Sequence, residues 1–445
     1  MSTVDTPTTG RADQHLAAAY ANDRTHVFHS WSAQAAIRPV VMAGGSGSRI
    51  WDDQGNTYLD FSSQLVNVNL GHQHPRMIEA IKAQADRLCT IAPSAANDMR
   101  SEAARLIAER APGDLNMVFF TNGGAEAIEN AIRLAKGHTG RPKVLSAYRS
   151  YHGSTTGAIS LTGEARRFDS EPGMPGAVKF FGPYLYRSAF HATTEQEECE
   201  RALQHLRDVV VGEGVDRVAA IVLETVVGTN GILVPPDGYL AGVRALCDEF
   251  GIVMISDEVM AGFARCGEWF AVDRWHVVPD LITFAKGVNS GYVPLGGVAI
   301  SQKIADTFRD RVYQGGLTYS GHPLACATAV ASINIFEDEG IVEHARMLGT
   351  DVFGPVLRSI AERHPCVGEV RGLGAFWAIE LVGDRATRAP ADAATMQTIT
   401  SACKSRGLWP FIAANRIHVV PPCNTSIDDA RAGLAVIDEV LSLVD

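Results

Sequence analysis

The stretch LITFAKGVNSGYVPLGG, residues 281–297, is an apolar run that ends in a lysine, Lys286, and then breaks into a glycine-rich loop. Two earlier apolar runs end in charged residues in the same way, at Glu224 and at Asp257. The three charged residues lie 33 and 29 positions apart, about one βαβ unit each. Because ligands of open α/β sheets bind outside the carboxyl ends of the strands, we expect these side chains to meet in one crevice. The alternative is that each one caps a strand at the surface.

Short apolar runs alternate with helical patterns from Met117 onward. Patterns such as GAEAIENAIRLAK and YLAGVRALCDEFG separate the apolar runs. Strands that alternate with helices form right-handed βαβ units, so the sequence predicts an α/β fold with a mostly parallel sheet covered by helices. The expected strands are MVFFT (117–121), KVLSAY (143–148), VAAIVLE (218–224), IVMISDE (252–258), LITFAK (281–286) and LGGVAIS (295–301).

The segments on either side of this region predict a second, smaller domain. GGSGSRIWDDQGNTYLDF (44–61) is typical of a twisted hairpin that turns at residues 53–56. Its glycines resemble a phosphate loop, but no strand precedes them and no helix follows. The C-terminal part mixes helical and strand patterns, as expected of an α+β domain that the hairpin completes. We therefore expect an N-terminal segment in residues 1–75 that contributes to the small domain, a large domain in residues 76–325 and a C-terminal small α+β domain in residues 326–445.

The composition limits the classes of partner. The 445-residue chain has a net charge of −11, 46% apolar residues and 20% charged residues, as is typical of a soluble globular protein. We expect no membrane span, because no run of about 18 apolar residues occurs, and no nucleic acid, because no lysine or arginine cluster occurs. The polar N-terminus MSTVDTPTTGRADQHL predicts a loose tail of a cytoplasmic protein. Eight widely spaced cysteines without a C-x-x-C pair predict neither disulfides nor a metal site, so small molecules are the expected partners.

Lys286 and Asp257 are the residue types that a pyridoxal phosphate site requires. A partly desolvated lysine loses its proton and becomes a nucleophile that forms a Schiff base with an aldehyde. Pyridoxal phosphate also needs a carboxylate that keeps its ring nitrogen protonated, which is the role expected of Asp257. The phosphate is expected where a strand runs into Gly123, Gly124 and Ala125. This tripeptide opens a helix, whose N–H groups and dipole favour negative charge.

The expected strand KVLSAY leads into RSYHGST, which carries two further candidates. Tyr151 can lie flat on a bound pyridine ring in an offset stack, and the alternative is a tyrosine packed in the core. For His152 two interpretations stay open, a site residue and a buried histidine that donates to a backbone carbonyl.

Five motifs, taken in order, make the chain resemble a known family. They are TNGGAEAIENAIRLAK, YRSYHGS, ISDEVMAGFARCGEWFA, PDLITFAKGVNSGYVPLGGV and GLTYSGHPLACA. Together they resemble the class III aminotransferases, the omega-transaminase group of the fold-type I pyridoxal-phosphate enzymes. The resemblance spans roughly residues 40 to 440, and this ordered set of motifs is highly specific.

The resemblance implies a role for each matching residue. Lys286 would bond the cofactor and move protons, Asp257 would pair with the ring nitrogen, and Tyr151 would stack on one ring face. Val259 would pack on the other face. Thr318 would reach the phosphate of the neighbouring subunit, so the expected active unit is a homodimer, alone or within a tetramer. The other residues expected to contact the cofactor are Gly123, Gly124, Ala125, His152 and Glu224.

Several positions depart from the family pattern. The family usually has a hydroxyl residue on each side of the central glycine where this chain has Gly-Gly-Ala, so a hydroxyl contact to phosphate is missing. Many relatives have a tryptophan where Val66 falls. Phe411 and Ser154 stand where relatives place arginines that bind a substrate carboxylate. Arg416 is the nearest substitute, although on the strand NRIHVV a solvent-facing position is the alternative. The candidate substrate residues are Val66, Ser154, Thr229, Phe411 and Arg416.

These features predict a ping-pong aminotransferase. The resemblance to the omega-amino acid:pyruvate branch, including taurine–pyruvate aminotransferases, makes taurine, β-alanine and primary amines the expected donors and pyruvate the expected acceptor. Another pyridoxal-phosphate reaction on the same scaffold, such as that of an aminomutase, racemase or decarboxylase, stays open. The alternative from another class is a nucleotide-binding protein that uses GGSGSR or NGGAEA. The first motif lacks the acidic ribose-binding residue about 20 positions on, and pyridoxal phosphate explains the second better.

Overall fold

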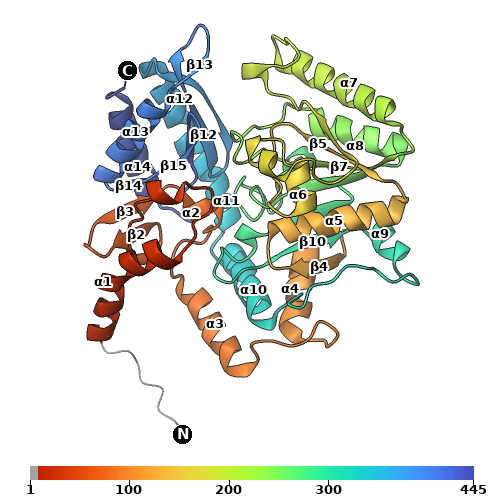
Figure 1. Ribbon diagram of the computed structural model, residues 1–445, viewed down its shortest axis with the longest axis horizontal. Helices are drawn as coiled ribbons and strands as arrows, with labels where there is room; N and C mark the ends of the chain where they lie inside the picture. Colours follow the sequence, from red (N-terminus) through yellow and green to blue (C-terminus); the bar gives the residue numbers. More distant parts are fainter. Residues whose placement is uncertain (1–8, 445) are drawn as a thin grey trace.

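A seven-stranded sheet forms the centre of the larger part of the molecule (Figure 1). The computed structural model describes residues 9–444. The strands lie in the order β4-β10-β9-β8-β7-β5-β6, and neighbouring strands are parallel except in the two pairs that involve β10. This arrangement confirms the predicted α/β fold with a mostly parallel sheet. The strands are β4 Met117–Thr121, β5 Lys143–Ala147, β6 Ala177–Phe180, β7 Val218–Glu224, β8 Val253–Asp257, β9 Leu281–Phe284 and β10 Gly296–Ile300.

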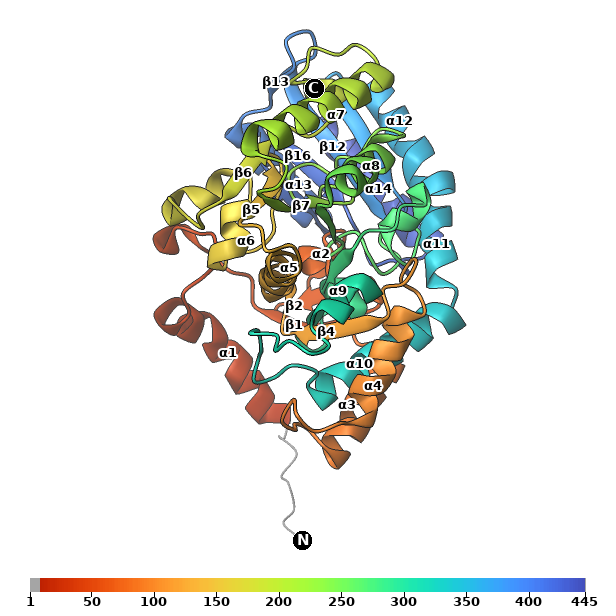
Figure 2. The same cartoon turned by 90° about the vertical axis from the view of Figure 1, so that its right-hand side faces the viewer.

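Helices cover both faces of this sheet, and alternate residues of its strands pack on opposite sides (Figure 2). In β7, Ala220 and Val222 pack in one core cluster with α5, whereas Ile221 and Leu223 pack in another with α7 and α8. All seven residues of β7 are buried, which is why this strand reads as an unbroken apolar run. The covering helices are α5 Gly124–Thr139, α6 Thr156–Leu161, α7 Glu195–Glu213, α8 Tyr239–Phe250 and α9 Gln302–Thr307.

The register of the strands brings the carboxyl ends of β7, β8 and β9 to one edge of the sheet. Glu224 lies opposite Asp257, and Asp257 lies opposite Thr283. Lys286 follows the end of β9 by two residues and begins the short helical turn η5 (Lys286–Val288). The spacing of charged residues along the sequence therefore becomes a row of charged side chains at one sheet edge.

A four-stranded sheet joins the two ends of the chain. Strands β1, β2 and β3 form antiparallel pairs with a turn at residues 53–56, as predicted for the hairpin. The C-terminal strand β14 pairs with β3 in parallel, with Leu408 opposite Leu59. The GGSGSR segment lies in the β1–β2 hairpin, so it does not open a helix as a phosphate loop would. The strands are β1 Met42–Ser46, β2 Arg49–Asp52, β3 Thr57–Asp60 and β14 Leu408–Trp409.

A third, antiparallel sheet lies in the C-terminal part, in the order β11-β12-β16-β15 with β13 added to β12. Its strands are β11 Val367–Leu373, β12 Phe376–Asp384, β13 Ala389–Pro390, β15 Phe411–Ala413 and β16 Arg416–Val419. The remaining α-helices are α1 Thr9–His26, α2 Ser63–Val66, α3 Pro75–Arg87, α4 Asp98–Ala108, α10 Pro323–Asp338, α11 Ile341–Met347, α12 Gly354–Arg363, α13 Ala393–Ser405 and α14 Ile427–Leu441. Shorter helical turns are η1 Gln34–Ala36, η2 Ala165–Ser170, η3 Leu185–Arg187, η4 Ala271–Trp275 and η6 Leu348–Phe353.

Helix α10 runs without a break through the expected domain boundary between residues 325 and 326. This helix packs against α3 and α4, which belong to the expected large domain. We propose that α10 connects the large domain to the small domain, and that the three-part division otherwise follows the three sheets.

The N-terminal segment differs from the expected loose tail. Residues 9–26 form α1, and the first eight residues of the expected tail lie outside the described residues. Alanines, which have the highest helix propensity, recur along this segment, and Arg24 and His26 in the last turn suit the negative end of the helix dipole. No helix within residues 9–444 is long and apolar enough to cross a membrane.

Candidate active site

A cavity of about 690 Å³ lies at the carboxyl edge of the central sheet. Residues from the sheet, from the N-terminal segment and from β15 and β16 form its wall. The structure therefore brings Glu224, Asp257 and Lys286 together, as expected from their spacing. The lining residues that the sequence predicted are Gly124, Ala125, Tyr151, His152, Ser154, Glu224, Thr229, Asp257, Val259, Lys286, Phe411 and Arg416.

Lys286 has a left-handed backbone conformation, with φ of 45°, at the turn where β9 ends. Burial lowers the pKa of Lys286 from 10.5 to about 8, although the neighbouring carboxylates Asp257 and Glu224 act in the opposite direction. Two arginines, Arg166 and Arg265, lower it further. About a tenth of this amine is therefore unprotonated at pH 7 and about half at pH 8, far more than for an ordinary lysine, as a nucleophile or a general base requires.

Asp257 ends β8 as a nearly buried carboxylate with a side-chain exposure of 4%. One carboxylate oxygen, Oδ2, lies 2.7 Å from Nδ1 of His152, and the other, Oδ1, accepts a hydrogen bond from the Val259 N–H at 3.1 Å. The His152 ring therefore contacts a carboxylate and not a backbone carbonyl. The other ring nitrogen, Nε2, is buried and has no partner among the described residues. These contacts fix the orientation of the Asp257 carboxylate.

Glu224 connects two loops through its carboxylate. Oε1 accepts a hydrogen bond from the Tyr151 N–H at 2.9 Å, and Oε2 accepts one from the Gly228 N–H at 2.7 Å. Burial raises the pKa of Glu224 to about 7, against the opposing effect of His152 and of the two backbone hydrogen bonds. Glu224 thus holds the segment of Tyr151 against the end of β7.

The N-terminus of α5 lies on the cavity wall at Gly124 and Ala125. A Cβ at position 124 would lie 2.9 Å from Cγ1 of Val259, so only glycine allows this approach of helix and loop. The first N–H groups of a helix have no intrahelical acceptor and attract anions. Gly123, which precedes the helix in an extended conformation, does not line the cavity.

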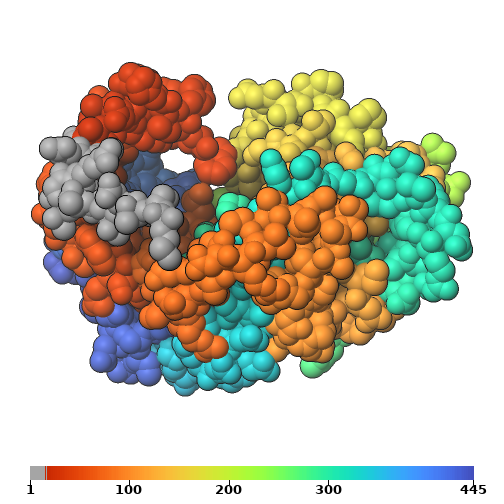
Figure 3. Space-filling model, turned by 90° about the horizontal axis from the view of Figure 1, so that it is seen from below, coloured from red at the N-terminus to blue at the C-terminus, as the bar shows by residue number. Residues whose placement is uncertain are grey.

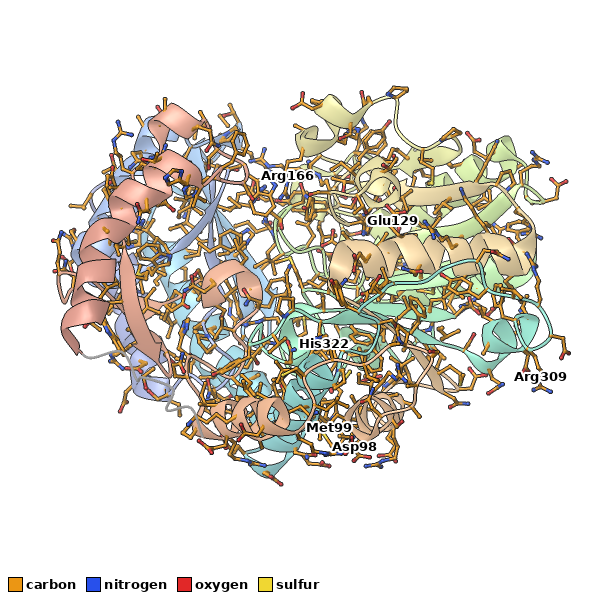
Figure 4. The ribbon with its side chains drawn as sticks, turned by 60° about the horizontal axis from the view of Figure 1, so that its bottom comes forward. Asp98, Met99, Glu129, Arg166, Arg309 and His322 are labelled. Atoms are coloured by element: carbon orange, nitrogen blue, oxygen red, sulfur yellow. The ribbon has the colours of Figure 1, made fainter. Side chains whose placement is uncertain are left out.

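Arg166 is a lining residue that the sequence analysis missed. Its guanidinium lies 3.8 Å from the centroid of the Tyr151 ring and pairs through Nε with Glu164. A second nitrogen, NH2, is buried without a partner among the described residues. Figure 4 shows Arg166 where its loop faces the N- and C-terminal elements. This loop carries two adjacent arginines in the sequence, but such a pair is also found on solvated surfaces and so does not identify a site residue.

The structure places some of the expected substrate residues on the cavity wall and one away from it. Ser154, Thr229 and Phe411 line the cavity, and Ser154 Oγ lies 2.9 Å from the Tyr151 hydroxyl. Val66 does not line it, and its expected role in the substrate pocket stays a prediction. The physical reason for its position is the left-handed backbone of α2, which has φ of 43° at Ser63, 60° at Gln64 and 58° at Val66. The Val66 side chain is consequently buried in an apolar cluster that includes Val226, Ile232 and Met260.

Leu65 and Trp31 line the cavity instead of Val66. They are 51% and 62% exposed, which places them at its outer part. Thr318 lies outside the cavity and is exposed, so it has no contact with the site of its own chain. Its expected role in the site of a neighbouring subunit stays a prediction.

Arg416 on β16 faces the cavity and not the solvent. Its Nε is buried and has no partner among the described residues, and burial lowers the pKa of its guanidinium. The cross-strand neighbour Glu380 is already engaged, because it accepts hydrogen bonds from Tyr184, from Arg187 and from Arg371. Arg416 is thus available for an anionic group of a ligand.

The cavity fits pyridoxal phosphate. Its volume lies within the range of small-molecule sites, about 300 to 1,000 Å³. The wall carries an amine with a lowered pKa at Lys286, an oriented carboxylate at Asp257 and a helix N-terminus at Gly124. These groups match the aldehyde, the ring nitrogen and the phosphate of the cofactor. No group of His, Cys, Asp and Glu side chains within residues 9–444 is arranged to hold a metal ion.

Comparison with known proteins identifies the family. The profile of the family Aminotransferase class-III matches residues 31–441. The chain is 38% identical over 394 residues to a probable aminotransferase of Mycobacterium tuberculosis, covering 85% of this chain and 81% of the relative. It is 32% identical over 437 residues to the taurine–pyruvate aminotransferase of Bilophila wadsworthia, covering 95% of each chain.

A solved structure agrees with this relationship. The taurine:2-oxoglutarate aminotransferase of Bifidobacterium kashiwanohense, in complex with pyridoxal phosphate and glutamate, superposes with a TM-score of 0.93 and 41% identity, covering 96% of this chain and 97% of that one. The family expected from the sequence motifs is therefore confirmed. The chain belongs to the class III aminotransferases and is an enzyme that uses pyridoxal phosphate.

Proposed function

We propose that this aminotransferase moves the amino group of an omega-amino acid or a primary amine, of the taurine or β-alanine type, to a keto acid, with pyruvate as the acceptor. The observation that carries the proposal is Arg416, a cavity-lining arginine whose Nε lacks a partner among the described residues. Ser154 and Phe411 line the same cavity as uncharged residues. The names of two relatives, a taurine–pyruvate and a taurine:2-oxoglutarate aminotransferase, support the donor class.

The proton transfers of the reaction are assigned to Lys286. Bound pyridoxal phosphate supplies an aldehyde carbon for bonding an amine and a ring that accepts electrons when a substrate C–H bond breaks. Lys286, with its pKa lowered to about 8, would take the proton from the substrate carbon through Nζ and, as a general acid, would deliver it to the carbon of the cofactor that carried the aldehyde. It faces the cavity from the turn after β9 and therefore reaches a ligand held against the sheet edge.

The Asp257 carboxylate holds a proton on the ring nitrogen of the cofactor. His152 and the Val259 N–H bond both carboxylate oxygens and prevent the group from rotating. Val259 and Tyr151 would pack on opposite faces of the ring. The Arg166 guanidinium lies over one face of Tyr151.

The remaining cofactor contacts are assigned to the N-terminus of α5 and to Glu224. Gly124 and Ala125 donate backbone N–H groups to the phosphate, and Gly123 gives the chain its extended entry into the helix. Glu224 keeps the Tyr151 segment in place through its two backbone hydrogen bonds. No side-chain hydroxyl is present at the glycine–alanine step, so backbone amides provide the phosphate contacts there.

Arg416 binds the acid group of the donor at the end of the cavity formed by β15 and β16. Phe411 on β15 packs edge-on against His418 and presents an apolar surface beside Arg416. A donor whose amine is terminal and whose sulfonate or carboxylate is remote places its two polar ends at Lys286 and Arg416. A buried carboxylate without a cation is costly, typically several kcal/mol after relaxation, so acids that cannot reach Arg416 are poor donors.

A second candidate acceptor, 2-oxoglutarate, is favoured by a separate observation. Arg166 lines the cavity and has a buried, partnerless NH2, so the wall offers a second cation besides Arg416. Two cations suit an acceptor with two carboxylates. The acceptor of the relative with 41% identity is 2-oxoglutarate, whereas that of the taurine–pyruvate relative is pyruvate.

The test is steady-state kcat/KM for a panel of donors with each acceptor. Taurine, β-alanine and a primary amine are expected to exceed glutamate when pyruvate is the acceptor. Arg166→Ala separates the two acceptors, because it lowers kcat/KM for 2-oxoglutarate only if Arg166 binds the second carboxylate. Glutamate with 2-oxoglutarate as the fastest pair would overturn the donor class.

The active unit is a homodimer in the cytoplasm. Support for the dimer comes from Thr318, which is exposed and outside its own cavity, and from exposed apolar side chains of the N-terminal segment, Phe28 at 86% and Trp31 at 62%. Figure 3 shows this segment as an arm beyond the body of the molecule. Sedimentation at concentrations used for kinetics tests the dimer, and a monomer with full activity would contradict it.

A further inference from the structure

Arg265 is a completely buried arginine without a carboxylate partner. Its guanidinium donates to the carbonyl oxygens of Ala375 at 2.9 Å and Pro421 at 2.5 Å, to Ser63 Oγ at 3.2 Å and to Asn69 Oδ1 at 2.7 Å. Its Nε has no partner, and none of the ion pairs within residues 9–444 includes it. Buried charges are usually paired, so an arginine satisfied by neutral acceptors alone calls for a functional explanation.

The segments that Arg265 joins are strained. Ser63, which contacts the guanidinium, has φ of 43°, and Phe263 and Ala264, which precede Arg265, have φ of 55° and 72°. Non-glycine residues persist in this left-handed region only where surrounding contacts hold them, and such strain concentrates at functional sites. Asn69 provides a second contact, because its Nδ2 donates to the Phe263 carbonyl oxygen at 2.8 Å while its Oδ1 accepts from Arg265.

This network also supports the turn that carries Lys286. A Cβ at Gly287 would lie 2.4 Å from Asn69 Nδ2 and 3.0 Å from Cβ of Phe263, so the backbone beside Lys286 rests directly on these two residues. Lys286 itself has a left-handed φ of 45°. The contacts therefore run from Arg265 through Asn69 to the turn of the lysine.

The charges that act on Lys286 come from four residues. Asp257 and Glu224 favour its protonated form, and Arg166 and Arg265 favour its neutral form. Of the two arginines, Arg166 pairs with Glu164, whereas Arg265 has no carboxylate partner.

The titratable groups near Arg265 are the thiols of Cys266 and Cys423 and the Glu258 carboxyl. Burial raises the pKa of the neighbouring thiols Cys266 and Cys423, so both stay neutral. The Glu258 carboxyl, which acts on Cys266, is bonded to Thr225 and to two backbone N–H groups, and burial raises its pKa to about 7. Neither thiol therefore neutralises the charge of Arg265, and the Glu258 carboxyl is held by partners other than Arg265.

We propose that Arg265 is a positioning residue for Lys286, which anchors the turn of the lysine through Asn69 and places a positive charge without a carboxylate partner at the base of that turn. The inference rests on the proposed role of Lys286 in the reaction. Arg265 touches neither the cavity nor a substrate, since it is absent from the cavity wall and fully buried.

The test measures the protonation of Lys286 directly. In the full-length protein freed of cofactor, the rate of acetylation of Lys286 is followed by peptide mass spectrometry as a function of pH. Asn69→Asp gives Arg265 a carboxylate in the place of a neutral acceptor, and Arg265→Met removes the charge. Both are expected to raise the pH midpoint of acetylation by about 0.5 to 1 pH unit, which corresponds to about 0.7 to 1.4 kcal/mol at about 1.36 kcal/mol per unit.

Two controls separate charge from general damage. Arg265→Lys keeps the charge and is expected to leave the midpoint within about 0.2 pH unit, while it loses hydrogen bonds and lowers the melting temperature. Arg244→Met removes an arginine that is paired with Asp248 and Asp280, and it is expected to leave the midpoint unchanged. The absorption of the cofactor–lysine chromophore in the loaded enzyme, titrated with pH, should shift in the same variants.

An unchanged midpoint in Asn69→Asp would overturn the proposal even if Arg265→Met does not fold. An equal shift in Arg244→Met would also overturn it, because the effect would then not depend on Arg265. A wild-type protein that forms no chromophore at Lys286 would instead refute the proposed role of this lysine, so the two failures are distinguishable.

Discussion

Replacing Asp257 by asparagine is expected to preserve the fold and remove most of the activity. The carboxylate is 4% exposed and is held by His152 at 2.7 Å and by the Val259 N–H at 3.1 Å. Water from the solvent therefore cannot take the place of this carboxylate in the variant. Two unit charges about 4 Å apart attract each other by about 4 kcal/mol at an effective dielectric constant of about 20. The uncharged amide loses this stabilisation of the protonated ring nitrogen. At about 1.4 kcal/mol per tenfold, the expected loss in kcat is about 1,000-fold.

The assay is steady-state kcat on protein whose cofactor content has been measured by absorbance. Asp60→Asn is a matched control, because Asp60 is a buried carboxylate that lies 2.8 Å from His72 but does not line the cavity. This control is expected to lower the melting temperature while kcat stays within about threefold, since neither Asp60 nor His72 lines the cavity. Near-normal turnover in fully loaded Asp257→Asn, or an equal loss in the control, would refute the reasoning.

Three further predictions concern the same site. Because burial lowers the pKa of Lys286 from 10.5 to about 8, kcat, which reports the enzyme–substrate complex in which this amine is free, should rise with pH between 6 and 9 with a midpoint near 8, and a flat profile would exclude this lysine as the base. Arg416→Ala should lower kcat/KM for taurine about 10- to 150-fold, because a charge-assisted hydrogen bond contributes about 1.5 to 3 kcal/mol. The kcat/KM for a primary amine without an acid group should stay nearly unchanged. An unchanged donor ranking would remove Arg416 from the site. A heterodimer of a Thr318→Ala chain and a Lys286→Ala chain should retain one intact site and about half of the activity, whereas two defective sites would place Thr318 in its own subunit's site.

The central sheet was predictable from the sequence because its strands are buried on both faces. Strands such as β7 and β9 therefore appear as unbroken apolar runs, and the charged residues at their carboxyl ends mark the sheet edge. The edge strand β6, at residues 177–180, was not predicted. It has four residues and three of them are only partly buried, so no apolar run distinguishes it from a loop.

Other features of the site depend on contacts that sequence patterns do not contain. The hydrogen bond of His152 joins it to Asp257, 105 residues away, and no local pattern indicates that pairing. Arg166 reaches the cavity from a loop with no regular spacing. The inward position of Val66 follows from a left-handed backbone that surrounding packing stabilises. Residue types and spacing thus indicate the chemistry, whereas long-range packing decides which neighbours complete the site.

The most direct test of the account is the identity of the lysine that bonds the cofactor. The chain has seven lysines, so a label on one particular lysine is distinguishable from random labelling. The purified, yellow protein is reduced with borohydride, digested and mapped by mass spectrometry. We predict bleaching of the visible absorption and a stable cofactor label on the peptide that contains Lys286. A label on any other lysine, or no label in protein that carries the cofactor, would contradict it.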